Sequence, residues 1–325
     1  MSAALVSQTP AMAAANVANI SLADKPVRII RAAAVYKAGV GVLVQKDDIV
    51  ETGAGGAQLE VSPEMILALG PDTRIYLSNI GADAQSRTEL VLLKGWVKLM
   101  SKGSGAAKRV IVTSPAIKVA IDSGSSIIHS IPGKGEMFAE EGTQIVNDMD
   151  ERGKAGADTK VNREQFAINN AGQGLKILPR PAKDFLAEMP IAFRDPVTPA
   201  PDRLKGARVP ASKERDADFA DVEPWLNNTL AVKKSFVSRF SPRLKDANFR
   251  KQLDDQLGQS AEWKPILHPP LPKDAAKDGG KPAGAGVPGG AAQSASSAPA
   301  ATSAASAASA RSASVPVNGP VLKYK

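Results

Sequence analysis

Cysteine and histidine are the residue types that most often bind metals or act in catalysis, and this sequence has few of them. It contains no cysteine, which excludes disulfides, zinc–thiolate sites and thiol nucleophiles. Its two histidines, His129 and His268, have no acidic cluster at metal-ligand spacing beside them. His129 lies in the apolar run 126–131, which predicts a strand histidine that forms a hydrogen bond. Neither histidine therefore indicates a metal site.

Carboxylate pairs and serines are the other candidates for catalysis. Glu140 and Glu141 are neighbours in a predicted strand, so their side chains point to opposite faces and cannot converge on one substrate. Asp254 and Asp255 form a second adjacent pair, which in principle could serve acid–base chemistry. A catalytic serine would need a base within reach, and the sequence has no nucleophile elbow. We therefore expect a protein that is not an enzyme, with no catalytic residues, no cofactor and no bound metal.

Aromatic side chains are the candidates for binding. Trp225, Phe236, Phe240 and Trp263 belong to a segment whose apolar residues recur at helical intervals, and we predict partner contacts at these four positions. Trp96, together with Trp225 and Trp263, could instead stack on sugar rings. The competing interpretation, which the sequence favours for each tryptophan, is packing in the core or at an interface.

Short apolar segments between residues 35 and 178 are the elements that would position these side chains. Gly, Pro, Asp and Ser separate them at close spacing, which is typical of a sandwich, barrel or solenoid of β-strands. Ile117, Val119 and Ile121 alternate with Lys118 and Ala120, which indicates one buried face. Gly95 stands between two of the segments, where the chain must bend tightly. We expect strands at 42–45, 57–61, 66–69, 74–78, 89–93, 96–100, 109–113, 117–121, 126–130, 136–139, 143–146, 165–168 and 175–178.

The N-terminal residues, 1–34, are predicted to be a leader. Small residues around Ala11-Met12-Ala13 resemble the end of a secretory signal peptide and its cleavage site. The positive n-region is missing, so we expect that the start codon is misassigned and that the true one lies upstream. The alternative is a flexible, Ala-rich terminus of a cytosolic protein.

Composition divides the rest of the chain into four regions. Residues 35–180 form the β-domain, and residues 181–220 are a Pro-rich linker or a strap over a neighbour. Residues 221–267 predict two or three short helices, broken near Pro242 and Pro265. So small a unit cannot bury its aromatic residues alone, which implies docking on the β-domain or on a partner. Residues 268–325, rich in Ala, Pro, Ser and Gly, are expected to be a disordered tail.

The formal net charge of +8 does not by itself indicate nucleic-acid binding. Lys and Arg are mixed with acidic residues through most of the chain, so we expect no nucleic-acid partner. A local excess of Lys and Arg lies within residues 233–251, and it favours a solvated helical face over an anionic partner such as phospholipid. No stretch approaches the roughly 18 apolar residues of a membrane span, so none is predicted.

Read in order, the β-region resembles the FecR-like domain family of bacterial envelope proteins. Residues 45–53, QKDDIVETG, are similar to the opening turn and strand of the family, although Lys46 stands where a glycine is common. Similar to the hairpin and strand pairs that follow are residues 66–78 (ILALGPDTRIYLS), 90–99 (LVLLKGWVKL), 112–116 (VTSPA, with Ser114 inserted) and 136–146 (EMFAEEGTQIV). The segment 221–267 resembles a C-terminal extension of some proteobacterial FecR-domain proteins.

The resemblance implies an all-β, extracytoplasmic scaffold, either a sandwich or a solenoid-like FecR domain, with no catalytic residues in its motifs. We predict a binding or signalling module, periplasmic or otherwise extracytoplasmic, that engages another envelope protein through strand edges and the docked helices. A cell-wall or polysaccharide-binding accessory protein is one alternative. A regulator of iron uptake is the other, weakened because no anti-sigma segment or membrane span precedes the β-domain here.

Overall fold

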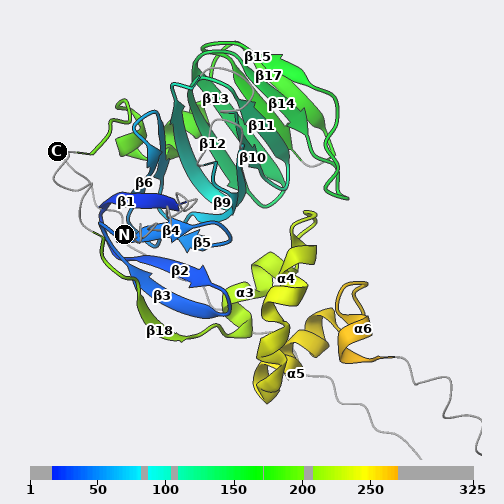
Figure 1. Ribbon diagram of the computed structural model, residues 1–325. Coiled ribbons are helices and arrows are strands. Elements are labelled where there is room, and N and C mark those ends of the chain that lie inside the picture. The colour runs from blue at the N-terminus through cyan, green and yellow to red at the C-terminus, as the bar shows by residue number, and fades with distance from the viewer. Residues whose placement is uncertain (1–16, 82–86, 104–108, 171, 201–207, 270–325) are drawn as a thin grey trace, which may run out of the picture. The chain divides into compact units, whose positions relative to one another are not determined.

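A computed structural model describes residues 17–81, 87–103, 109–170, 172–200 and 208–269. In this part of the chain, eighteen strands form one continuous hydrogen-bonded sheet, and the helices are few and short (Figure 1). The all-β prediction is therefore confirmed. The expected signal-peptide remnant and nearly all of the expected tail lie outside the described residues.

The sheet folds into two layers that share one long strand, β9 (Thr88–Ser101). Layer A has the strand order β4-β1-β6-β7-β9-β12-β13-β16-β17, and layer B has the order β18-β3-β2-β5-β8-β9-β10-β11-β14-β15. All of these pairings are antiparallel except that of β9 with β10. The arrangement is a sandwich. The other strands are β1 (Val17–Ala23), β2 (Val27–Arg31), β3 (Ala34–Ala38), β4 (Leu43–Gln45), β5 (Ile49–Glu51), β6 (Ala57–Ser62), β7 (Met65–Leu69), β8 (Arg74–Asn79), β10 (Val110–Thr113), β11 (Ile117–Ile121), β12 (Gly124–Ile131), β13 (Lys134–Glu141), β14 (Gln144–Asp148), β15 (Thr159–Val161), β16 (Phe166–Asn170), β17 (Gly174–Leu178) and β18 (Ser212–Asp216).

Strand β9 passes from layer B to layer A at Gly95. Its first half pairs with β8 and β10, and its second half pairs with β7 and β12. Gly95 has a φ of +99°, and a Cβ at this position would lie 2.5 Å from the Cα of Thr73. The Thr73 hydroxyl donates to the carbonyl of Trp96 and accepts from the N–H of Trp96, which fixes the crossing. The bend expected at Gly95 is confirmed, but the strand continues through it.

Several consecutive strands change layer where the sequence predicted hairpins or strand pairs. β7 and β8 belong to layers A and B, so the turn at Pro71-Asp72 joins the layers and does not close a hairpin. β13 and β14 are divided in the same way. In the turn between β7 and β8, the N–H of Gly70 donates to the carbonyl of Trp96. This bond holds the turn beside the point where β9 passes between the layers. Local sequence reveals such a turn but not which layer the next strand joins.

The core lies between the two layers. Ile117, Val119 and Ile121 of β11 are buried in it, and Lys118 and Ala120 are half-buried on the other face, as the alternation predicted. Inward-facing residues of both layers belong to one continuous apolar cluster. Each layer therefore covers the inner face of the other.

The first strands begin earlier than the sequence predicted. Residues 17–31, expected to be leader, form β1 and β2. β1 lies between β4 and β6, and β2 lies between β3 and β5, with Ile20 and Ile29 fully buried. The boundary at residue 35 is therefore too late. β1 follows directly after an Ala-rich run, so its alternation is easily read as part of the leader.

Residues 181–200 cross the outer face of layer A as a strap, the second of the two expectations for this region. The strap contains α1 (Lys183–Glu188) and a 3₁₀ turn, η2 (Ile191–Phe193). Phe185 packs on Trp96 of β9, with ring centroids 5.0 Å apart. The buried ammonium of Lys98 donates to the carbonyls of Phe193 and Asp195, at 2.8 and 3.0 Å. Beyond the strap, β18 pairs with β3 at the edge of layer B.

The C-terminal helices pack on the outer face of layer B (Figure 1). They are α3 (Phe219–Leu226), α4 (Lys233–Phe240), the 3₁₀ helix η3 (Ser241–Lys245), α5 (Ala247–Leu257) and α6 (Lys264–Leu267). α4 ends before Pro242, and Pro265 lies in the first turn of α6, so the predicted breaks are present. Apolar helix residues form one cluster with Ile30, Val35 and Ile49 of the strands. None of the described helices is long and apolar enough to cross a membrane.

Arg239 of α4 binds the helices to layer B. Its guanidinium donates to the backbone carbonyls of Ile30, Ala32 and Asp47 at 2.6 to 2.7 Å. It also lies over two aromatic rings of its own helix. Burial lowers the pKa of Arg239. This member of the basic cluster at 233–251 therefore serves packing and does not lie on the solvated face expected for the cluster.

Candidate functional site

The four aromatic residues predicted to contact a partner are buried. The exposed fraction is 0% for Trp225, Phe236 and Phe240, and 2% for Trp263. The ring centroid of Phe236 lies 5.0 Å from that of Tyr76 on β8 and 5.9 Å from that of Trp225. These are contacts of core packing, the interpretation that the sequence favoured for the tryptophans. Partner contact at the four positions stays a prediction, and it would require the helices to separate from layer B.

His129 of β12 forms a buried polar pair with Glu136 of β13. The His129 Nδ1 and the Glu136 Oε2 are 2.9 Å apart, and the Lys134 ammonium lies 2.7 Å from the Glu136 Oε1. Burial alone would raise the pKa of Glu136, but hydrogen bonds with His129 and Lys134 outweigh it and hold that pKa below its usual value. Trp96 stacks on the His129 ring, with centroids 3.7 Å apart. The prediction of a hydrogen-bonded strand histidine is confirmed.

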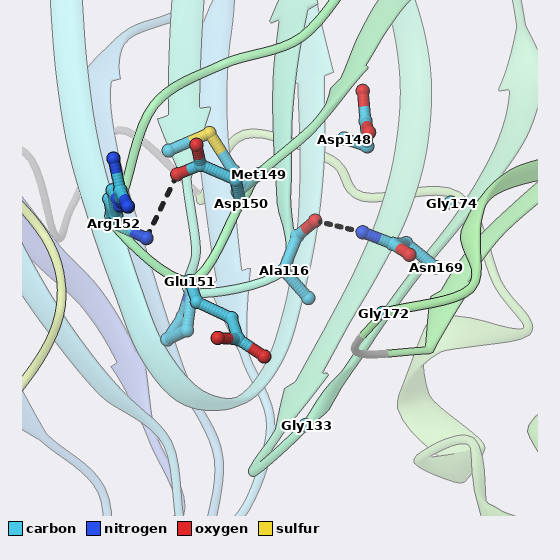
Figure 2. A pocket seen from close by; sticks show the side chains of 11 residues that line it. Ala116, Gly133, Asp148, Met149, Asp150, Glu151, Arg152, Asn169, Gly172 and Gly174 are labelled. Carbon is cyan, nitrogen blue, oxygen red and sulfur yellow. Dashed lines mark hydrogen bonds between the residues drawn. The ribbon is translucent and has the colours of Figure 1, made fainter.

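An open cleft of about 470 Å³ lies at one end of the sandwich, where turns of both layers meet (Figure 2). Layer B contributes the turn before β11, with Pro115 and Ala116, and the acidic turn 148–152 at the end of β14. Layer A contributes Gly133 from the turn between β12 and β13, Asn169 from the end of β16, Gly172 from the turn that follows and Gly174 from the start of β17. The cleft therefore joins residues that are far apart in the sequence.

Asn169 connects the two layers across the cleft. It is 3% exposed, and its Nδ2 donates to the Ala116 carbonyl at 2.7 Å, the contact drawn in Figure 2. The same carbonyl accepts from the N–H of Met149 at 2.9 Å. The Oδ1 of Asn169 is buried and has no donor among the described residues. A buried acceptor without a partner costs about 1–3 kcal/mol. The wall of the cleft therefore contains a polar group that the fold leaves unsatisfied.

Three carboxylates stand on the turn at the end of β14. The Asp150 Oδ1 accepts from the backbone N–H of Arg152 at 2.9 Å, which orders the turn (Figure 2). Asp148 lies against Gly156, where a Cβ would come within 2.0 Å of the Asp148 Oδ1. Glu151 is exposed at the rim. Arg152 is the one cation among the described residues that line the cleft, so the lining carries more negative than positive charge.

The lining is rich in hydrogen-bond acceptors. The three carboxylates accept, while Pro115, Ala116 and Met149 supply apolar surface. Within the described ranges, no group of three His, Cys, Asp or Glu side chains lies close enough to hold a metal ion. The arrangement therefore suits a group that donates hydrogen bonds or carries positive charge.

Asn169, Asp148 and Glu151 were not among the residues predicted from the sequence. A signal was present, since NDMDERG at 147–153 and NNAGQG at 169–174 are polar, turn-forming runs after predicted strands. The sequence does not show that these turns meet, because β14 and β16 belong to different layers.

No protein-family model matches the chain, and no curated protein matches it. Two crystal structures of a protein from Parabacteroides distasonis ATCC 8503, described as a candidate anti-sigma factor, are similar to it at 14% identity with a TM-score of 0.35. The match covers 43% of this chain and 62% or 63% of the other, so this chain spans less than two thirds of that protein. The FecR-like resemblance stays a prediction.

Proposed function

We propose that this protein is a non-catalytic, extracytoplasmic binding or signalling module of the FecR-like type, and that another envelope protein docks at its cleft. The observation that carries the proposal is the cleft, where turns of both layers gather an unpaired buried acceptor and three carboxylates. Turns on a rigid sandwich are common sites of recognition, because the core holds their backbone in place.

Solvent exposure of the carboxylates supports binding over catalysis. Asp150 and Glu151 are exposed on their turn. A catalytic acid or base is usually placed where burial or a neighbouring charge tunes its pKa to the reaction. Charges at the rim of an interface act instead in steering and in partner choice.

Site-specific photocrosslinking tests where the partner docks. A photoreactive amino acid replaces Arg152 at the cleft in the full chain, expressed in the native host. The matched control replaces Arg163, which is 70% exposed in the turn before β16, at the opposite end of that strand. We expect one envelope protein to crosslink at position 152 and not at 163. Equal crosslinking at the two positions, or none at 152, would overturn the proposal.

Cell fractionation tests the compartment separately. We expect the protein to be released with periplasmic markers, or to remain with the envelope, when the outer layers of the cell are opened. Recovery with cytosolic markers alone would contradict an extracytoplasmic role.

A cell-wall glycan is the second candidate ligand. The acceptor-rich lining favours it, because sugar hydroxyls are hydrogen-bond donors. Sedimentation of the chain with purified peptidoglycan, weakened by Glu151→Gln and not by Glu164→Gln, would support this candidate over a protein partner.

A further inference from the structure

We propose that a second cleft, which we call the basic cleft, binds a small oxyanion between Arg74 and Lys94. The basic cleft has a volume of about 320 Å³ and opens on layer B, beside the point where β9 passes to layer A. Three cations line it with two carboxylates, namely Arg28, Arg74 and Lys94 with Glu51 and Asp72. It shares no lining residue with the cleft at the turns of β14 and β16, so it is a separate site.

A row of charged side chains crosses layer B at directly opposite positions of four strands. Arg28 of β2 is opposite Glu51 of β5, and Glu51 is opposite Arg74 of β8. Arg74 in turn is opposite Lys94 of β9. Directly opposite side chains interact, so unlike charges stabilise a sheet and like charges destabilise it. The row alternates in sign as far as Arg74 and then repeats the positive charge at Lys94.

The first cation of the row is fully paired. Arg28 donates from Nε and Nη2 to the Oε2 of Glu51, and from Nη1 to the Oδ1 of Asp221 at 2.9 Å. Glu51 is 5% exposed, and its Oε1 lies 3.5 Å from the Nε of Arg74. That separation allows an ion pair but is longer than an ordinary hydrogen bond. Glu51 therefore mainly neutralises Arg28 and leaves Arg74 weakly paired.

The last two cations of the row have no strong acceptor in the part of the chain that the structure describes. There, the Nη groups of Arg74 and the ammonium of Lys94 form no hydrogen bond and no further ion pair. The second carboxylate of the lining, Asp72, is exposed in the turn before β8 and pairs with neither described cation. Two like charges therefore lie side by side, without a carboxylate between them to continue the alternation.

The crossing of β9 keeps these two cations together. Lys94 immediately precedes the crossing at Gly95, and Arg74 follows Thr73. The Thr73 hydroxyl bonds to the backbone N–H and carbonyl of Trp96, which fixes β9 against the start of β8. β9 therefore cannot slide along β8 to place another residue opposite Arg74, and the repulsion between the two cations is built into the register.

An oxyanion is the class of ligand that this arrangement fits. Guanidinium and ammonium groups only donate hydrogen bonds, and carboxylate and phosphate groups accept several at once. An oxyanion between Arg74 and Lys94 takes the place of the missing carboxylate and converts a repulsion into two ion pairs. The walls of the basic cleft are preformed, because backbone hydrogen bonds of 2.8 and 3.0 Å join residues 52–53 to residues 72–73. Binding therefore has a low ordering cost.

Three small probes that share one ring test the inference: phenyl phosphate, benzoate and the neutral benzamide. Each is titrated at constant ionic strength into the ¹⁵N-labelled full chain. We expect both anions to shift the side-chain Nε–H signal of Arg74 and the backbone signals of 72–74 and 94, and benzamide to leave them in place. The tighter anion identifies the ligand group as phosphate or carboxylate. Equal shifts with benzamide, or no shift with either anion, would overturn the inference.

A variant of Lys94 tests whether the pair of cations is the site. Lys94→Gln removes one cation, and Lys160→Gln is the matched control, because Lys160 is an exposed strand lysine of β15 outside the basic cleft. We expect Lys94→Gln to weaken binding of the tighter anion about fivefold or more. Lys94→Arg and the control should each change it less than twofold. Equal weakening in Lys94→Gln and Lys160→Gln would reveal general attraction to a basic protein and would overturn the inference.

Urea unfolding gives a readout that a purely structural role for Lys94 would not produce. Without an added anion, Lys94→Gln should raise the urea midpoint, because it relieves the repulsion with Arg74. Added phenyl phosphate should raise the midpoint of the parent chain more than that of the variant, since a ligand stabilises the folded state that binds it. A lower midpoint for the variant without anion would mean that Lys94 already has a stabilising partner in the chain, and the inference would be wrong.

Discussion

Lys98 and Glu136 are charged residues with almost no exposed surface, 2% and 1%, and each is bonded on several sides. Lys98 joins Glu140 and two carbonyls of the strap, and Glu136 joins His129 and Lys134. An ion buried without partners costs several kcal/mol. Such residues therefore tolerate loss of a partner poorly, which makes them sensitive probes of this fold.

Glu136→Gln should destabilise the protein by about 1–3 kcal/mol at pH 7, because a charged acceptor in a buried pair becomes neutral. The pKa of Glu136 lies below its ordinary value of 4.5, so the charged form contributes stability that is fully present above that pH. This contribution is lost as the pH falls through the folded-state pKa. The difference between variant and parent chain in urea unfolding should therefore shrink below about pH 4.5.

Glu164→Gln is the control for that comparison, since Glu164 is 72% exposed. It should change stability by less than about 0.5 kcal/mol at either pH. A pH-independent difference between Glu136→Gln and the parent chain would contradict the role assigned to the charge of Glu136.

At the scale of elements, the crossing of β9 depends on one glycine. Gly95→Ala places a Cβ 2.5 Å from the Cα of Thr73, so either β9 or the turn that holds Thr73 must move. The φ of +99° at this position is also unfavourable for alanine. We expect a loss of about 3 kcal/mol or more, measured by urea unfolding. Gly53→Ala is the control, because a Cβ there meets nothing within 4 Å, and it should cost less than about 1 kcal/mol. Equal losses would show that β9 tolerates a side chain at the crossing.

Docking of the helices depends on the three guanidinium nitrogens of Arg239. Lysine at this position keeps the charge but cannot donate to three carbonyls in the same geometry. Arg239→Lys should therefore destabilise the protein by about 2–4 kcal/mol. It should also increase the solvent exposure of Trp225, which tryptophan fluorescence measures. The control Arg163→Lys, on an exposed turn, should have little effect on either measurement. An Arg239→Lys chain as stable as the control would contradict the docking role.

Every strand expected from the sequence is present, because alternation and turn residues act over a few neighbouring residues. β1, β2, β3, β15 and β18 were not expected. SKERD in β18 is exposed at every position and carries no apolar alternation, so only its pairing with β3 makes it a strand. The cleft could not be predicted either. Asn169 and Asp148 come together only because β16 lies in layer A and β14 lies opposite it in layer B. Local pattern thus identifies strands, while their assignment to layers depends on long-range contacts.

At the scale of the whole molecule, both outer faces of the sandwich are covered by later parts of the chain. The strap covers the apolar patch of layer A around Trp96 and Phe166, and the helices cover Tyr76 and its neighbours on layer B. The β-region expected at 35–180 is therefore not a complete folding unit. It lacks two inner strands and would expose both patches to water.

A shortened chain of residues 35–180 should consequently fail to fold, whereas a chain of residues 17–269 should unfold in one cooperative transition. Without β1, layer A is interrupted between β4 and β6, and without β2, layer B is interrupted between β3 and β5. Loss of the strap and helices would leave Trp96 and Tyr76 uncovered. We expect the shorter chain to bind a hydrophobic dye and to lack near-ultraviolet circular dichroism, the signs of lost tertiary packing. A cooperative urea transition in the 35–180 chain would contradict this view and would make the strap and the helices dispensable additions to an independent β-domain.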